Sequence, residues 1–255
     1  MTGTPADAIE TRTLNGRAVA KAIRAETADG VARLQRDHGV TPGLTVVLVG
    51  SDPASEVYVR NKEKAASEAG MNGRVLRLPA DTDEDRILEV VDGLNADPDV
   101  HGILVQLPLP DGVDDRRVTE RIHPDKDVDG FHPVNAGRLS IGLPGFAPCT
   151  PAGIIEMLKR YEIPLRGAHA VVVGRSNIVG KPMSLMLLRE HCTVTICHSR
   201  TRDLDAVCAT ADILVAAVGV LGLIGARAIK PGAVVVDVGM HNVTDEDTCR
   251  KLFGD

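Results

Sequence analysis

Tryptophan is absent from the 255-residue sequence, and aromatic residues together make up only 2% of it. The hydrophobic core must therefore be aliphatic, which is typical of parallel β-sheets covered by helices. A strong charge bias is also missing: the formal net charge is −6, and no dense run of basic residues occurs. This composition argues against nonspecific nucleic-acid binding. The apolar run at residues 213–226 is too short to span a bilayer, so no membrane segment is expected.

Cysteine motifs for metals or disulfides are missing as well. The sequence contains five cysteines, an odd number that cannot all pair within the chain, and no Cys-x-x-Cys pair occurs. We therefore expect reduced thiols in a cytoplasmic protein, and no metal site. The first residues include Asp7 and Glu10 and lack an apolar stretch, which argues against a secretory signal.

Apolar runs and amphipathic segments alternate along the chain. This alternation predicts an α/β protein with mostly parallel sheets in two domains, residues 1–148 and 149–255. Residues 124–151 are rich in proline, glycine, aspartate and asparagine, which indicates a long loop with the domain boundary near its end. The expected strands are 44–49, 75–78, 101–106, 170–173, 194–197, 213–216 and 234–238. The expected helices are 18–36, 55–66, 84–94 and 204–209, with one more beginning near 154 and another ending near 188.

One charged side chain lies on the apolar face of an expected helix. On a helical wheel at about 100° per residue, Lys62 falls with Tyr58, Ala65, Ala66 and Ala69. Tyr58 precedes Lys62 by one turn, so the two side chains are neighbours. A lysine that loses hydration gives up its proton more readily and can act as an acid or base near neutral pH. The alternative is a lysine with a buried stem and an ammonium group that reaches water.

Side chains at strand ends and in loops could meet this lysine. Gln106 ends an expected strand, and a neutral amide can hold a lysine in place without fixing its charge. Asp129 lies in a loop, where a carboxylate could bind an aminopyrimidine-like edge through two hydrogen bonds. Its neighbours Asp125 and Asp127 are expected to be solvated. His132, beside a proline, is expected to be structural rather than an acid–base group.

A second site is predicted where the buried strand 170–173 leads through a glycine turn into a helix. Gly174 and Gly180 bracket this turn, although the spacing is not Gly-x-Gly-x-x-Gly. Strand, glycine turn and helix N-terminus form the phosphate site of a Rossmann-type unit. The next strand is followed by Ser199 and Arg200, where an NAD-preferring site usually has an acid, and Arg175 lies in the first turn. A hydroxyl and an arginine suit a 2′-phosphate, so NADP is favoured over NAD. A structural turn with surface arginines remains the alternative.

Five motifs follow one another along nearly the whole chain: Tyr58–Lys62, Gly102–Pro110, Asp125–Pro133, Pro148–Pro151 and Gly174–Pro182. Together they resemble the bifunctional methylenetetrahydrofolate dehydrogenase/methenyltetrahydrofolate cyclohydrolase family. The resemblance implies a folate-binding catalytic domain in residues 1–148, an NADP-binding Rossmann domain in residues 149–255, and a catalytic cleft between them. It also implies a homodimer that needs no metal.

The resemblance gives each matched residue a role. Lys62 would be the catalytic lysine, central to the cyclohydrolase step, and Gln106 would position it. Tyr58 would pack along the aromatic part of the folate, and Asp129 would anchor the pterin ring. The protein would oxidise 5,10-methylenetetrahydrofolate with NADP and hydrolyse the methenyl product to 10-formyltetrahydrofolate. The residues implied to contact NADP are Gly174, Arg175, Ser176 and Ser199, with Met240 at the position that closes over the cofactor.

Two other functions stay open. A different two-domain NADP-dependent oxidoreductase, such as one acting on a shikimate-like substrate with a Lys–Asp pair, would need no glutamine beside its lysine. A non-catalytic NADP-binding protein would have no use for an intact Lys62 and Asp129. One departure from the family is that members continue past the position of Asp255 with a Pro-Gly-Gly-Val-Gly-Pro segment and a last helix. If that segment is truly missing, folate binding and stability are expected to suffer.

Overall fold

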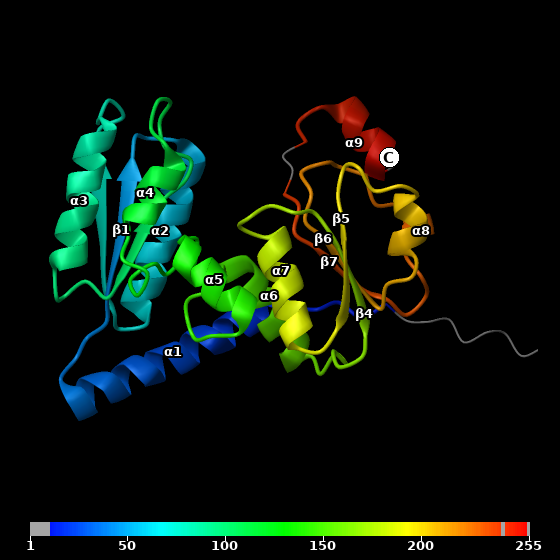
Figure 1. The fold of residues 1–255 in the computed structure, drawn as a ribbon, viewed down its shortest axis with the longest axis horizontal. Coiled ribbons are helices and arrows are strands. Elements are labelled where there is room, and N and C mark those ends of the chain that lie inside the picture. Colours follow the sequence, from blue (N-terminus) through cyan, green and yellow to red (C-terminus); the bar gives the residue numbers. More distant parts are fainter. Residues whose placement is uncertain (1–10, 241–242, 254–255) are drawn as a thin grey trace, which may run out of the picture. The chain divides into compact units, whose positions relative to one another are not determined.

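The computed structural model describes residues 11–240 and 243–253, so Asp7 and Glu10 lie outside it. The chain divides into two compact units (Figure 1). One is coloured blue to green, and the other is yellow-green to red except for its blue residues 11–14. One unit is Asn15–Cys149, and the other combines residues 11–14 with residues 150–253. Each contains a parallel sheet with helices packed on it, so the predicted α/β class is confirmed. No helix in the described ranges is long and apolar enough to cross a bilayer.

The first unit contains, in chain order, α1 (Gly16–His38), β1 (Gly43–Val49), α2 (Pro53–Glu68), β2 (Asn72–Leu78), α3 (Glu84–Ala96), β3 (Gly102–Val105), α4 (Asp115–Arg121) and α5 (Pro133–Ile141). Its sheet has the order β2-β1-β3, and all strands are parallel. The central strand β1 is apolar on both faces. Val47 and Val49 pack with α3 and α4, whereas Val46 and Leu48 pack with Val59 of α2.

The second unit contains α6 (Cys149–Arg160, whose first residue belongs to the first unit), β4 (His169–Val173), α7 (Gly180–Arg189), β5 (Thr193–Cys197), α8 (Leu204–Cys208), β6 (Ile213–Ala216), a 3₁₀ turn (Ala226–Ala228), β7 (Val234–Asp237) and α9 (Glu246–Phe253). Its parallel sheet has the order β5-β4-β6-β7. Val172 and Val215 pack with α6 and α7 on one face. Val171 and Leu214 pack with Cys208 of α8 on the other.

Both sheets reverse their strand order beside the first strand. From β1 the chain passes through α2 to β2 on one side, and β3 then lies on the other side. From β4 it passes through α7 to β5, and β6 lies on the opposite side. Ligands of open α/β sheets bind at the carboxyl ends of the strands at such a reversal. The topology therefore marks one candidate site in each unit.

The loop predicted for residues 124–151 is wrong, because α5 lies within it and α6 begins before its end. The start and stop signals of α5 are present in the sequence. Pro133 occupies the first turn, the His132 ring accepts a hydrogen bond from the Val134 amide at 3.1 Å, and Gly142 ends the helix with φ of +78°. Such an ending suits glycine. The high content of proline, glycine and asparagine concealed a short helix bounded by these residues.

Candidate functional site

Lys62 of α2 and Gln106, the residue after β3, meet at the strand-order reversal of the first unit. The Lys62 ammonium donates a hydrogen bond from Nζ to Gln106 Oε1 at 3.1 Å. The Gln106 backbone amide donates to the Val47 carbonyl at 2.9 Å, which anchors the residue to β1. Its side-chain Nε2 donates to the Leu107 carbonyl at 2.7 Å. Since Nε2 is engaged there, the amide oxygen is the atom presented to the lysine.

The helical wheel is wrong about Tyr58. This side chain is 47% exposed, whereas Val59 is fully buried against the sheet. The buried face of α2 runs through Ser55, Val59, Ala66 and Ala69, so it is centred one residue further along than the wheel suggested. Tyr58 and Lys62 lie at the border of that face, and Lys62 is only partly exposed. The border location gives the lysine access to a ligand while part of its stem is covered.

Asp129 lies in the same electrostatic environment as Lys62. Burial raises the pKa of the Asp129 carboxyl, the positive charge of Lys62 acts to lower it, and the charge of Asp127 raises it further. The thiol of Cys149 belongs to this cluster too: burial raises its pKa first, and the Asp129 charge adds to the shift. Sequence reasoning gave no role to Cys149, and its place in the Pro148–Pro151 motif was the one available signal.

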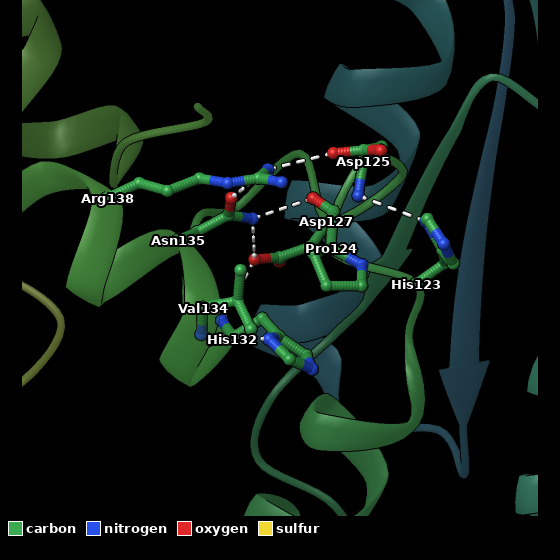
Figure 2. Close-up of polar contacts among 8 residues, drawn as sticks. All are labelled: His123, Pro124, Asp125, Asp127, His132, Val134, Asn135 and Arg138. Atoms are coloured by element: carbon green, nitrogen blue, oxygen red, sulfur yellow. Dashed lines mark hydrogen bonds and ion pairs between the residues drawn. The ribbon is translucent and has the colours of Figure 1, made fainter. Parts of the chain in front are cut away.

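The prediction that Asp127 is solvated is wrong, because the residue is only 2% exposed. Its Oδ2 accepts hydrogen bonds from the His132 amide and the Asn135 side chain, both at 2.9 Å (Figure 2). Asp125 does reach solvent, and Arg138 donates to its carboxylate at 2.8 Å. Such donors satisfy the hydrogen-bonding capacity of a carboxylate that water cannot reach. Sequence reasoning missed Asn135, since nothing in the pattern showed that α5 would bring it to Asp127.

His132 has the structural place that the sequence suggested. Its ring Nδ1 accepts a hydrogen bond from the Val134 amide and so caps α5. Its Nε2 lies 3.2 Å from the Glu120 carbonyl. In the described residues, no group of three or more His, Cys, Asp or Glu side chains is arranged to hold a metal ion. The five cysteines are free thiols.

The glycine turn of the second unit brings backbone atoms unusually close together. Gly174, directly after β4, has φ of +131°, and a Cβ there would lie 2.3 Å from the Ala217 carbonyl oxygen. A Cβ at Gly180, the first residue of α7, would lie 2.3 Å from the Gly174 carbonyl oxygen. Only glycine fits these two positions. Ser176 Oγ accepts hydrogen bonds from the amides of Val179 and Gly180, at 3.1 and 3.2 Å, and so shapes the entry to the helix.

A cavity of about 240 Å³ lies at the carboxyl ends of β4, β6 and β7. Small residues that follow β6 and β7, among them Gly219 and Gly239, line this cavity. Met240 lies at its rim and is 78% exposed. The sequence did not indicate that Ile178 and Val179, in the turn between β4 and α7, would contribute apolar side chains to the lining. The cavity is lined by Ser176, Ile178, Val179, Ala217, Val218, Gly219, Val238, Gly239 and Met240.

Arg175 and Ser199 lie at the same edge of the second sheet. Val173 of β4 pairs with Cys197 of β5, and each candidate follows its strand by two residues. Both side chains are exposed. Ser199 is in a tight turn in which the Thr201 amide donates to the His198 carbonyl at 2.8 Å. The edge therefore offers a guanidinium and a hydroxyl next to the glycine turn.

Family models match both halves of the chain. The model described as the tetrahydrofolate dehydrogenase/cyclohydrolase catalytic domain matches residues 14–129. The model described as the NAD(P)-binding domain of the same proteins matches residues 148–255. Among curated relatives, the bifunctional protein FolD of Rhodopseudomonas palustris (strain BisB18) is 54% identical over 245 residues, which are 96% of this chain and 83% of that protein.

Solved structures of similar proteins share the fold. The bifunctional FolD methylenetetrahydrofolate dehydrogenase/cyclohydrolase of Campylobacter jejuni is 44% identical with a TM-score of 0.88, over 91% of this chain and 82% of that one. The Trypanosoma brucei methylenetetrahydrofolate dehydrogenase-cyclohydrolase, solved with NADP and an inhibitor, is 38% identical with a TM-score of 0.87. That match covers 92% of this chain and 81% of the other.

Proposed function

The chain belongs to the tetrahydrofolate dehydrogenase/cyclohydrolase family, and from that premise we propose how its residues carry out the two reactions. It oxidises 5,10-methylenetetrahydrofolate to the 5,10-methenyl compound with NADP, and it hydrolyses that product to 10-formyltetrahydrofolate. Both family models fit, so neither a shikimate-type oxidoreductase nor a non-catalytic binding protein is needed to explain the chain. The observation that carries the residue roles is the 3.1 Å hydrogen bond between Lys62 and Gln106.

The second unit fits a dinucleotide. Gly174 and Gly180 leave a cradle that a Cβ would fill, at the amino end of α7, where backbone amides suit phosphate. NADP⁺, when bound, supplies the acceptor for the hydride. Ser176 would offer its hydroxyl hydrogen to a phosphate, while Arg175 and Ser199 would hold the 2′-phosphate by charge-assisted hydrogen bonds. Met240 would cover the nicotinamide side of the cavity.

Lys62 is the proton carrier of the hydrolytic step. In its amine form it takes a proton from water as the water oxygen bonds to the methenyl carbon. The resulting ammonium then gives a proton to N5 as the bond between that carbon and N5 breaks. The remaining hydroxyl proton leaves to solvent as the C=O bond forms, and the formyl group stays on N10. The Gln106 carbonyl can accept a hydrogen bond from either form of the lysine, so the side chain keeps its position through both transfers.

Asp129 and Tyr58 hold the substrate. An ionised Asp129 would accept two hydrogen bonds from the aminopyrimidine edge of the pterin, which presents two neighbouring N–H donors. The partly exposed Tyr58 ring, one turn before Lys62 on α2, would pack along the aromatic part of the folate. Binding at two places would keep the one-carbon unit beside the lysine.

The assembly and location are also proposals. Residues 1–148 would form the folate-binding catalytic domain and residues 149–255 the NADP-binding domain. The protein would work as a homodimer in the cytoplasm. Sedimentation of the purified protein across a concentration series would test the dimer, because a single monomeric species throughout would exclude it.

An absorbance assay tests the function. The protein is mixed with methylenetetrahydrofolate and NADP⁺, and reduced cofactor and methenyl product are followed together. We expect reduced cofactor to accumulate, while the methenyl signal stays low because hydrolysis removes it. Separately supplied methenyltetrahydrofolate should disappear without any cofactor. If neither signal differs from a protein-free control, the proposed activity is wrong.

A further inference from the structure

A buried carboxylate, Asp127, closes the turn on which Asp129 lies. The Asp127 carbonyl accepts a hydrogen bond from the Gly130 amide at 3.1 Å. Its side-chain Oδ2 accepts another from the His132 amide at 2.9 Å. Along the sequence, Asp129 lies inside the segment that each of these two hydrogen bonds closes. One residue therefore fixes the turn through its main chain and its side chain.

Both ends of the turn are attached to the rest of the unit. Asp127 forms an isolated parallel bridge with Ile103 of β3. At the far end, Gly130 has φ of +67°, and a Cβ there would lie 2.7 Å from the nearest backbone carbon. The turn is thus tied to β3, the strand that Gln106 directly follows. This attachment sets the place of Asp129 relative to the lysine and its glutamine.

Asn135 of α5 holds the Asp127 carboxylate in place. Its Nδ2 donates to Asp127 Oδ2 at 2.9 Å and to the Pro124 carbonyl at 2.7 Å (Figure 2). Arg138, one turn later, donates to the Asn135 Oδ1 at 3.3 Å, which fixes the direction of the amide. Asn135 is fully buried. Burying a carboxylate is costly unless its donors are in place, so the shape of the turn depends on these contacts.

We propose that Asp127 and Asn135 are positioning residues for folate binding: they hold Asp129 in the orientation in which its carboxylate meets the pterin. The inference rests on the proposed role of Asp129. It adds that Asp127, the buried carboxylate of this loop, acts on folate binding without touching the substrate. It also assigns α5, which lies in the predicted loop, the task of supporting the substrate site.

The charge of Asp127 has a second effect. Among the described residues, the titratable groups that interact electrostatically with Asp129 are Lys62 from α2, Asp127 from its own loop and Cys149 from the start of α6. Burial is the largest cause of the raised pKa of Asp129, and the Asp127 charge adds to it. If the ionised form binds pterin, binding is present above this pKa and is lost as the pH falls through it. Neutralising Asp127 should therefore extend binding to lower pH.

Two substitutions of Asp127 separate shape from charge. Asp127→Ala removes the acceptor for both donors, and we expect KM for methylenetetrahydrofolate to rise by about 10- to 100-fold with a smaller change in kcat. Asp127→Asn keeps an amide oxygen that can accept from the His132 amide and from Asn135. Its KM at pH 7 should stay close to that of the wild-type enzyme, which is rescue by the conservative variant.

The pH profile of kcat/KM gives a readout that a purely structural role would not move. In the wild-type enzyme, kcat/KM should fall as acid protonates Asp129 in the free enzyme. In Asp127→Asn this fall should occur at lower pH. Asp99→Asn is the matched control, because its exposed carboxylate precedes β3 and so lies at the opposite end of that strand from Gln106. It should leave both KM and the profile unchanged.

The outcomes distinguish the possible failures. A folded Asp127→Ala with wild-type KM, or an Asp127→Asn profile that coincides with the wild-type one, would overturn the inference. If Asp127→Ala does not fold, the Asp127→Asn profile alone decides. An inactive wild-type enzyme would refute the proposed function, and wild-type KM in Asp129→Asn would refute the role of Asp129. The dissociation constant for NADP should be the same in every variant, since the substitutions lie in the other unit.

Discussion

In both units the candidate site lies at the strand-order reversal of a parallel sheet. The first site is built from side chains, whereas the second is built from backbone. In the first unit, the strand-order reversal between β1 and β3 presents side chains, Lys62 with Gln106. In the second, the reversal between β4 and β6 presents backbone, at Gly174 and Gly180. Proton transfer needs ionisable groups at set distances, whereas phosphate binding needs amides that a ligand can approach closely. Under the proposed function, the same topology would serve chemistry in one unit and binding in the other.

The difference extends to what supports each site. The side-chain site is supported by a buried polar network, in which Asp127 and Asn135 bond to each other and to backbone groups of the same unit. The backbone site depends on the absence of side chains, and a single methyl group would obstruct it. We therefore expect the first site to fail through lost hydrogen bonds and charges, and the second through steric overlap.

The largest effect should come from removing the lysine. Lys62→Met keeps an unbranched side chain but removes the amino group, so residue 62 can neither donate to Gln106 nor carry a proton. We expect the cyclohydrolase rate to fall by about 10²- to 10⁴-fold, the usual contribution of a general acid–base group. Consumption of methenyltetrahydrofolate measures this rate, and calorimetry with NADP should give an unchanged dissociation constant.

Lys64→Met is the matched control for that prediction. Lys64 lies on the same helix, is exposed, and pairs only loosely with Glu68, with 3.7 Å between Nζ and Oε1. Such surface pairs contribute little. Equal loss of activity in both variants would mean that the helix, and not the Lys62 proton, is what matters. Weakened NADP binding in Lys62→Met would mean that the two sites are not built independently.

A smaller effect is expected from adding one methyl group to the second site. In Gly180→Ala the new Cβ would approach the Gly174 carbonyl oxygen to 2.3 Å, and backbone cannot move away as a flexible side chain could. We expect a loss of about 1–3 kcal/mol in the free energy of unfolding, together with weaker NADP binding. Gly153→Ala on α6 is the control, because no atom lies within 4 Å of its added Cβ. Chemical denaturation measures both, and equal losses would contradict the steric argument.

Much of the fold follows from the sequence because most strands are buried on both faces. The runs in β1 and β4 are almost wholly apolar, so they could be located without knowing what covers them. The helix α5 could not, since proline, asparagine, glycine and serine, which are typical of turns, make up nearly half of its short sequence. The exposure of Tyr58 was missed for a related reason: a wheel gives the apolar side of a helix only to within about one residue step of 100°.

The candidate site residues also divide into those that a local sequence pattern could predict and those that it could not. The glycine turn was predictable, because a strand followed by glycine and a helix is a local pattern. The grouping of Lys62 with Gln106 was a hypothesis from side-chain chemistry, and their contact depends on two elements that are 44 residues apart. The burial of Asp127 was missed, since it is created by Asn135 from a helix that was not predicted. Contacts between distant elements are what a periodic pattern does not contain.

The smallest effect should come from removing one charge at the edge of the second site. Arg175 is exposed, so its contact with a 2′-phosphate would be partly screened by water and salt. Arg175→Ala should raise the dissociation constant for NADP about tenfold, or about 1.4 kcal/mol, and that for NAD much less. Arg189→Ala, at the other end of α7, is the matched control for loss of a positive charge. Titrations with both dinucleotides at two salt concentrations separate the cases: equal effects on NADP and NAD would refute the 2′-phosphate contact, and a backbone-built site should still bind both.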